Sequence, residues 1–331
     1  MNKTKERRRY SKTELNLARA NPDSQIIGEL ASRLMGGESM SIAETNFAAS
    51  ILRRTKLEGS VSFVDLASIP AAQDFIFKNL YILYYADLVG RYGIDKAFGL
   101  VSIEEKNGDV IRLNEYYKDW KKIYSKNNHK ANPLLNLVIT ESCHQEYNKL
   151  KEIFLMGEIT QEEYDYKEKS IILHSKYLYL TAKAFFDEHR SNEVIATFHN
   201  REIVINEYSM VHILNRHLGG SAKQFDTQKS FHLDREINWL ELPYDLKSII
   251  ESLGSHPDTN VPTLIFLPFK FNGILYAIWT EEKTKHQAAK VIPITRLQSC
   301  YPIEDAKELK KIREHYRELR INDKLCAIVP I

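Results

Sequence analysis

The sequence has few cysteines, and they form no pattern that binds a metal or builds a disulfide framework. Cys143, Cys300 and Cys326 are odd in number and widely spaced along the 331 residues. Structural zinc sites need closely spaced Cys and His pairs, and disulfide scaffolds need a dense, even set. We therefore expect reduced thiols, as in a cytoplasm. No metal site and no cofactor is predicted.

The chain also lacks a long apolar run. Its most apolar stretch, residues 264–279, is interrupted by Pro268, Lys270 and Gly273, whereas a membrane span needs roughly 20 apolar residues. The basic start is not followed by the apolar segment of a secretory signal. We expect a cytoplasmic protein with no membrane partner.

An excess of charge of one sign is missing as well. There are 46 basic and 44 acidic residues, so the net charge is +2. DNA binding depends on many cationic phosphate contacts, and this balance argues against a DNA-binding protein of a mobile element. Residues 1–12 are the exception, because six Lys or Arg face one Glu. We predict a disordered basic tail there, open to an anionic partner.

What is present fits a globular α+β protein with two domains. Hydrophobic residues make up 43% and charged residues 27%, which is ordinary for a chain that buries cores. Residues 13–190 predict a helical domain. A capping box at Ser41 and Glu44 starts one helix, and the apolar residues 71–90 predict the central helix of a bundle. A small hairpin is predicted at 102–111, around the turn signal Asn107-Gly108.

Residues 141–190 predict a helical hairpin. Gly157 ends its first helix, and Thr160 with Glu163 forms a capping box for the second. An apolar stripe at seven-residue steps then runs along the second helix: Tyr164, Ile171, Leu178 and Phe185. Residues 150–169 also resemble the short helical hairpin of SHOCT-type modules. Packing against other helices or a homo-oligomer is the expected role.

The pattern changes near Ser191, where apolar periodicity shortens and β-branched and aromatic residues gather. We predict a domain boundary at 191–198, followed by an α+β domain over 198–331. Its expected elements are a strand at 198–205, helices at 207–218 and 244–253, strands at 263–269, 273–280 and 290–296, and a helix at 303–320. The turn between the first two of these meander strands is predicted at Asn272-Gly273, a strong hairpin signal. This order is a helix followed by an antiparallel meander.

Three segments of this domain carry its chemistry: INEYSMVHILNRHLGG, QKSFH and VIPITRLQS. Over residues 198–302 they resemble the phage-associated members of the barnase, EndoU, colicin and RelE-like (BECR) nucleases. Those domains have a helix with a His-Ile-Leu-x-Arg-His core, followed by an antiparallel sheet with a polar residue on its last strand. The resemblance implies a phage, mobile-element or bacterial defence setting, an RNA substrate, and an antitoxin or sensor protein as a further partner.

RNA cleavage without a metal needs a base, an acid and cations that hold phosphate charge, and His and Arg suit these roles. His212 and Arg216 are four residues apart and share a helix face, whereas His217 points about 140° away from His212. The candidate catalytic residues are His212, Arg216, His217, Lys229, His232 and Thr295. The candidate substrate-binding residues are Ser230, Arg296 and Ser299.

Each candidate also has a structural interpretation. His212 lies between Val211 and Ile213 and is as well explained by half-buried packing. His217 lies near a helix C-terminus, where the dipole alone favours a protonated imidazole. The leading hypothesis is a metal-independent endoribonuclease or toxin-like effector with a helical platform. The alternative is a non-enzymatic RNA- or protein-binding module with a degenerate nuclease fold.

Overall fold

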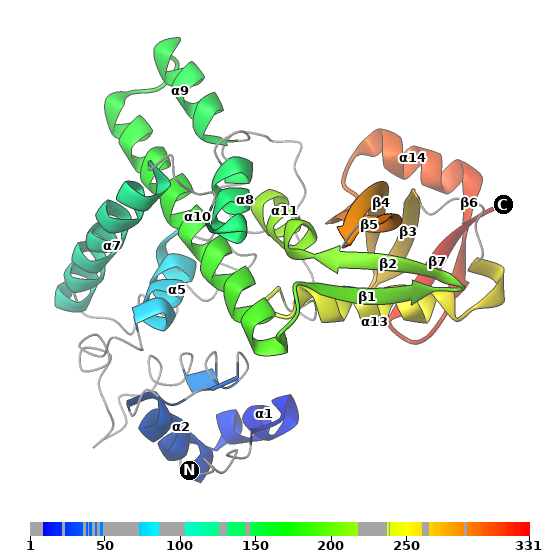
Figure 1. Ribbon diagram of the computed structural model, residues 1–331, viewed down its shortest axis with the longest axis horizontal. Coiled ribbons are helices and arrows are strands. Elements are labelled where there is room, and N and C mark those ends of the chain that lie inside the picture. The colour runs from blue at the N-terminus through cyan, green and yellow to red at the C-terminus, as the bar shows by residue number, and fades with distance from the viewer. Residues whose placement is uncertain are drawn as a thin grey trace. The chain divides into compact units, whose positions relative to one another are not determined.

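The computed structural model divides into two compact units, Met1–Tyr84 with Gly90–Lys118 and Tyr85–Val89 with Asp119–Ile331 (Figure 1). None of the helices within the described ranges has the length and apolar character needed to cross a bilayer. The structure describes residues 9–21, 24–35, 38, 40, 41, 44, 47, 48, 73–85, 103–125, 131–142, 146–217, 237, 239–259, 265–287 and 290–331.

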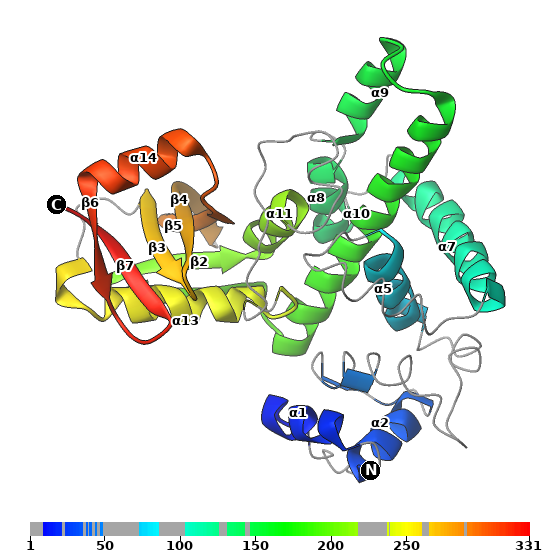
Figure 2. The ribbon, with the colours of Figure 1, turned by 180° about the vertical axis from the view of Figure 1, so that it is seen from behind.

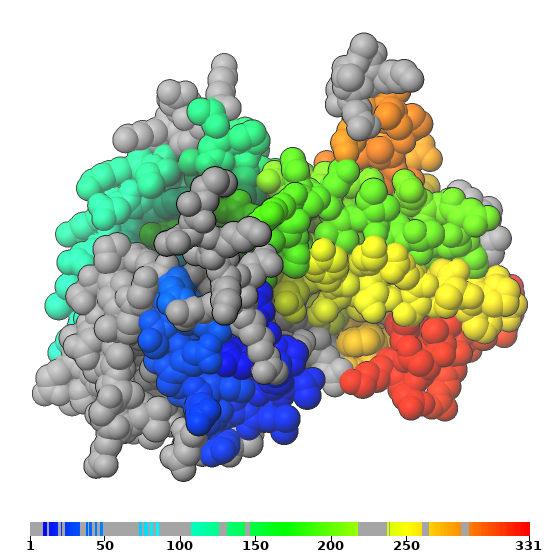
Figure 3. Space-filling view, turned by 60° about the horizontal axis from the view of Figure 1, so that its bottom comes forward, coloured from blue at the N-terminus to red at the C-terminus, as the bar shows by residue number. Residues whose placement is uncertain are grey.

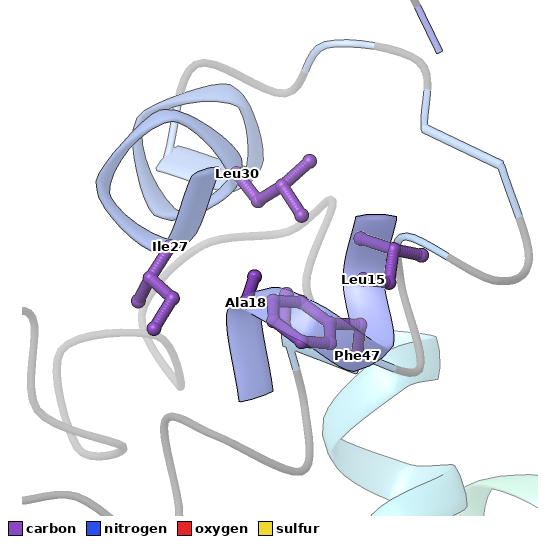
Figure 4. Close-up of a cluster of buried hydrophobic side chains, with 6 residues drawn as sticks. Leu15, Ala18, Ile27, Leu30 and Phe47 are labelled. Atoms are coloured by element: carbon purple, nitrogen blue, oxygen red, sulfur yellow. The ribbon is translucent and has the colours of Figure 1, made fainter. Parts of the chain in front are cut away.

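The first unit is helical. Its described elements are α1 (Lys12–Ala20), α2 (Gln25–Met35), α5 (Gln73–Tyr84) and most of α7 (Ile103–Tyr124). Ser11 caps α1, which begins at Lys12, so the end of the segment predicted as a tail over residues 1–12 is ordered; residues 1–8 lie outside the described residues. A buried cluster joins α1, α2 and a later segment through Leu15, Ala18, Ile27, Leu30, Phe47 and Ala48 (Figure 4).

Of two local structures that the sequence predicts in this unit, one is confirmed and one is wrong. The predicted capping box is confirmed, because the Ser41 N–H donates to Glu44 at 2.8 Å and the Glu44 N–H donates to Ser41 Oγ at 3.1 Å. The hairpin predicted around Asn107-Gly108 is wrong, since both residues lie inside α7. Long-range contacts hold that helix, among them a 2.9 Å hydrogen bond from Tyr84 Oη to Asp109 Oδ2.

Three helices open the second unit: α8 (Pro133–Ser142), α9 (Asn148–Leu155) and α10 (Gln161–His189). The α9–α10 hairpin is confirmed. Gly157 adopts φ +73° after α9, the left-handed conformation that glycine takes without strain. Thr160 and Glu163 form the capping box of α10. The apolar stripe is buried at Ile171, Leu178 and Phe185.

A seven-stranded sheet completes this unit, with order β1-β2-β5-β4-β3-β7-β6. It is mostly antiparallel, with a parallel pairing between β2 and β5. Helices α13 and α14 lie on opposite sides of the sheet, and Figure 2 shows the same arrangement from behind (Figures 1 and 2). The elements are β1 (Glu193–Phe198), β2 (Arg201–Asn206), α11 (Glu207–His217), α13 (Leu242–Gly254), η3 (Pro257–Thr259), β3 (Phe266–Phe271), β4 (Ile274–Gln287), β5 (Lys290–Pro302), α14 (Ala306–His315), β6 (Tyr316–Arg320) and β7 (Leu325–Pro330).

The class of mixed α and β is confirmed, and several boundaries are corrected. The strand predicted at 198–205 is the second half of a hairpin, because His199 takes φ +51° and turns the chain between β1 and β2. The helix predicted at 303–320 ends at His315, after which the chain adds β6 and β7. The turn predicted at Asn272-Gly273 is confirmed by φ values of +47° and +83°.

The boundary predicted near residues 191–198 falls inside the second unit. Helices α8 and α10 both pack against α11, which follows that boundary in the chain. The first helices of the second unit therefore form part of the surroundings of the candidate site.

Candidate functional site

Helix α11 is fixed at its first turn to the sheet strand beneath it. Asn206 precedes the helix, and its side-chain oxygen accepts the Ser209 N–H at 3.2 Å, as a capping residue does. The buried Ser209 hydroxyl donates to the Leu297 carbonyl of β5 at 2.6 Å. These bonds set both the start of α11 and its position along β5.

His212 lies at the centre of a polar cluster. The residue is 5% exposed. The ring Nδ1 lies 3.0 Å from Glu141 Oε2, on α8, and 3.3 Å from Tyr208 Oη, one turn earlier on α11. The imidazole stacks on the Tyr208 ring with centroids 5.2 Å apart and an interplanar angle of 19°. A carboxylate at Nδ1 fixes the ring and favours the tautomer in which Nε2 accepts a proton.

Strand β5 supplies a guanidinium to the same cluster. Arg296 lies over the Tyr208 ring, with Cζ 3.8 Å from the centroid, within cation–π range. Its Nη2 donates to Gln298 Oε1 at 3.0 Å and to Glu281 Oε2 at 3.3 Å. Gln298 in turn donates to Tyr208 Oη at 2.8 Å. We call Glu141, His212, Tyr208, Arg296 and Gln298 the His212 cluster.

The cluster continues onto β4 through Glu281. That carboxylate lies 2.7 Å from Lys283 Nζ. The hydrogen bond from Lys283, with further help from Arg296, lowers the pKa of Glu281. Glu281 therefore stays ionised and holds the Arg296 guanidinium against Tyr208.

A β-bulge at Gln298 lets β5 contact both Tyr208 and His217. Trp279 of β4 pairs with Ser299, but the next β4 residue, Thr280, pairs with Leu297, so Gln298 is the extra residue. Strand side chains alternate between faces, and residues 296 and 299 would lie on opposite faces of a regular strand. The inserted residue changes that alternation, so Arg296 contacts Tyr208 and Ser299 contacts His217.

His217 has neutral and aromatic neighbours. It is 7% exposed, and its Nε2 lies 3.3 Å from Ser299 Oγ. The ring stacks on Tyr301 at 5.4 Å. Tyr301 Oη accepts from Trp279 at 2.8 Å and donates to Glu308 at 3.2 Å. Burial, with a contribution from Glu308, raises the pKa of Tyr301 to about 12, so this phenol stays neutral. We call His217, Ser299, Tyr301 and Trp279 the His217 cluster.

The structure brings some predicted residues together and separates others. His212 and Arg296 share the His212 cluster, and His217 and Ser299 share the other. Arg216 lies on α11 between the two histidines, half-buried. Thr295 is not brought to His212, because its neighbour Arg296 points to α11 and adjacent strand residues point to opposite faces. The predicted Lys229, Ser230 and His232 lie outside the described residues.

Sequence reasoning missed Glu141, Tyr208, Gln298 and Glu281. Two of them had a signal. Tyr208 lies four residues before His212 on the same helix face, and Gln298 lies two after Arg296 on the same strand. Glu141 had none, because it reaches His212 from 71 residues away in the chain.

Across the described side chains, no group of three or more His, Cys, Asp or Glu residues is arranged to hold a metal ion. Comparison of the chain with models of protein families, with curated proteins and with solved structures gives no match, so function is inferred from the chemistry of the site.

Proposed function

We propose that the second unit is a metal-independent endoribonuclease, a toxin-like effector of a phage, mobile-element or bacterial defence system. The observation that carries the proposal is the 3.0 Å contact between His212 Nδ1 and Glu141 Oε2. The Arg296 guanidinium contacts the Tyr208 ring on which His212 stacks, within the same cluster. A carboxylate-supported imidazole beside a cation supplies a base and a charge-stabilising group, which phosphodiester cleavage requires.

In this mechanism His212 takes the proton of a ribose 2′-hydroxyl at Nε2, while Nδ1–H donates to Glu141. The 2′ oxygen attacks the adjacent phosphorus, and the bond from phosphorus to the 5′ oxygen breaks. The departing 5′ oxygen takes a proton from a water molecule, and the His212 imidazolium returns its own proton to the solvent. Arg296, and Arg216 one turn beyond His212, offset the extra negative charge on the phosphoryl oxygens. The products are a 2′,3′-cyclic phosphate and a free 5′-hydroxyl.

The test is RNA cleavage by the full chain in EDTA, with the product ends identified by mass spectrometry. Mixed-sequence single-stranded and hairpin RNAs are suitable substrates, because proteins read unpaired RNA most readily. Cyclic phosphate ends that accumulate in proportion to protein support the proposal. Products with 3′-hydroxyl ends, or intact RNA throughout, reject it.

A second candidate is a binding module that holds RNA or a protein without cleaving it. The observation in its favour is that both imidazoles are buried and already have partners within the protein. This candidate predicts that RNA binds and is recovered intact, or that RNA is ignored and a protein partner such as an antitoxin binds. The same cleavage assay, run beside an RNA-binding titration, separates it from the enzyme.

A further inference from the structure

Helices α11 and α14 cover the same face of strand β5. His217 of α11 contacts Ser299 and stacks on Tyr301. The Tyr301 hydroxyl donates to Glu308 of α14 at 3.2 Å. Figures 1 and 2, seen from opposite sides, both place β4 and β5 between the two helices. The part of this face between α11 and α14 is therefore formed by side chains of β4 and β5.

Strand β4 adds a row of side chains to this face. Trp279 pairs with Ser299 across the antiparallel ladder, and Glu281 pairs with Arg296. Directly paired residues of antiparallel strands point to the same face, and so does every second residue along one strand. Trp279, Glu281 and Lys283 therefore lie in a row beside α11, which contacts both Ser299 and Arg296.

Trp279 brings an exposed aromatic ring to this row. The residue is 36% exposed. One edge of its indole is fixed, because Nε1–H donates to Tyr301 Oη at 2.8 Å. The ring of Phe266 lies 5.1 Å away at an interplanar angle of 58°, so it approaches the indole at a tilt and is not stacked on it. An indole that is held at its edge and partly exposed can bind another planar ring at little cost in side-chain entropy.

Charged side chains continue the row outward along the β4–β5 hairpin. The side chain of Lys283 is 42% exposed and that of Arg296 is 15% exposed. Both contact Glu281, so these three groups carry one net positive charge. Further out, Lys285 pairs with Glu193 of β1 at 2.7 Å. Figure 3 shows the outer part of this hairpin (orange) standing beyond the green residues of β1 and β2. Lys283 can bind an anionic ligand while it stays paired with Glu281, because its ammonium group has three donors.

An exposed aromatic ring beside cations suits a single-stranded nucleic acid, whose bases stack on the ring while its phosphates contact the cations. Residues two apart along a strand are about 7 Å apart, so a base on Trp279 brings its backbone toward Arg296. Arg296 contacts Tyr208, on which His212 stacks. A base pair inside a duplex cannot take this place, because its neighbours cover its faces.

We propose that Trp279 is the stacking platform for one base of a single-stranded RNA, with the adjoining phosphate held by Arg296 and Lys283. The site deepens the proposed endoribonuclease and rests on that function, because the stacked base fixes the strand relative to His212. Stacking accepts every base, so binding through this site should show little sequence preference.

The test measures binding of the full chain to a fluorescein-labelled, mixed-sequence 2′-O-methyl RNA of about ten nucleotides, within the usual site size for a single strand. Methylation removes the attacking hydroxyl, so fluorescence anisotropy reports binding whether or not the chain cleaves RNA. Trp279→Ala should weaken binding about 5- to 150-fold, the range for one lost base stack. Trp279→Phe keeps an aromatic ring and should restore most of the affinity. The matched control is Tyr244→Ala, which removes a ring that is 42% exposed on α13 and should bind like the unaltered chain.

Two further measurements keep the test decisive. Lys283→Gln should reduce the slope of log affinity against log salt by about 0.7, the value for one phosphate contact on a single strand. Lys310→Gln, at a side chain that is 73% exposed on α14, should leave that slope unchanged. If Trp279→Ala does not fold, a 5-iodouracil base in the same oligonucleotide should crosslink to Trp279 of the unaltered chain on irradiation, as mass spectrometry of the peptides would show.

The outcomes separate this site from the catalytic proposal. Uncleaved RNA that binds through Trp279 supports the stacking site and rejects only the nuclease. RNA that is cleaved, while folded Trp279→Ala binds the methylated strand as tightly as the unaltered chain, overturns the stacking site alone. The stacking site is also overturned if the methylated strand does not bind, or if it crosslinks only to other residues.

Discussion

The two histidines of α11 are five residues apart and equally buried, yet their surroundings differ in kind. His212 contacts a carboxylate and a phenol, and the ring of that phenol also contacts a guanidinium. His217 meets a hydroxyl and an aromatic ring. A carboxylate at Nδ1 prepares an imidazole to take a proton at Nε2. His217 is held through a neutral hydroxyl and an aromatic ring, and we expect it to serve packing.

The partners of the two histidines also come from different parts of the chain. Ser299, Tyr301 and Trp279 all come from the sheet that follows residue 191. Glu141 comes from α8, before α9 and α10. The surroundings of His212 therefore depend on helices that the sequence assigned to a separate domain.

The largest effect is expected from dividing the chain. A fragment of residues 119–331 should fold and retain both clusters. A fragment of residues 191–331 keeps the His217 cluster but loses Glu141 and also Tyr177, whose hydroxyl accepts from Trp239 at 2.8 Å. It exposes the apolar side of α11, so it should be molten or insoluble. Circular dichroism and thermal unfolding of the two fragments decide this, and a cooperative melt of the shorter one would restore the boundary near Ser191.

The next largest effect compares the histidines directly. His212→Ala should lower the RNA cleavage rate about 10²–10⁴-fold, the typical loss of a general base. His217→Ala should cost less than about tenfold, through packing alone. Both variants must keep the unfolding temperature of the unaltered chain within a few degrees for the rates to be compared. Equal losses, or a greater loss at His217, would remove the distinction between the two clusters.

The free energy of unfolding should also differ between variants of the two clusters, by a smaller effect. Glu141→Ala removes the carboxylate that accepts from His212 Nδ1 and should cost about 1.5–3 kcal/mol, the usual worth of a hydrogen bond to a charged group. Ser299→Ala removes one neutral hydrogen bond and should cost about 1 kcal/mol. Urea unfolding monitored by fluorescence measures both. If Ser299→Ala lowers the free energy of unfolding more than Glu141→Ala does, the Glu141 carboxylate is not what distinguishes the His212 cluster.

The smallest expected effect is a pH dependence of the unfolding temperature, caused by Glu207 at the first turn of α11. Burial, and then the charge of Asp187, raise the pKa of Glu207. Ionising a carboxyl whose folded pKa is raised costs stability, and this cost grows as pH rises above its ordinary value near 4.5. Glu207→Gln should therefore melt slightly higher than the unaltered chain at pH 7 and equally at pH 3.5. Glu202→Gln, at an exposed position of β2, is the matched control, and an identical shift there would contradict this cause.

Some of these features were predictable because their causes are local. The capping boxes at Ser41 and Thr160 were confirmed because each is a reciprocal bond over three residues. The turn at Asn272-Gly273 was confirmed because both residues adopt positive φ readily. The same Asn-Gly signal failed at Asn107, since tertiary contacts along α7 override a local turn preference.

The site itself was predictable only in part. The helix and its histidines were visible in the sequence, whereas the pairing of His212 with Glu141 spans 71 residues. The bulge at Gln298 is likewise set by the register of two strands. Without the bulge, period-two alternation would place Arg296 and Ser299 on opposite faces. Neither feature has a signal in a single segment.

The most direct measurement uses a DNA oligonucleotide that contains a single ribonucleotide, incubated with the full chain in EDTA. The proposed attack by a 2′-hydroxyl predicts one cut, on the 3′ side of that ribonucleotide, leaving a 2′,3′-cyclic phosphate. The all-DNA oligonucleotide should stay intact, and His212→Ala should slow the cut at least about a hundredfold. Cleavage of the all-DNA strand, or an uncut ribonucleotide beside a mixed-sequence RNA that is also uncut, would contradict the assignment of His212 and Glu141 to RNA cleavage.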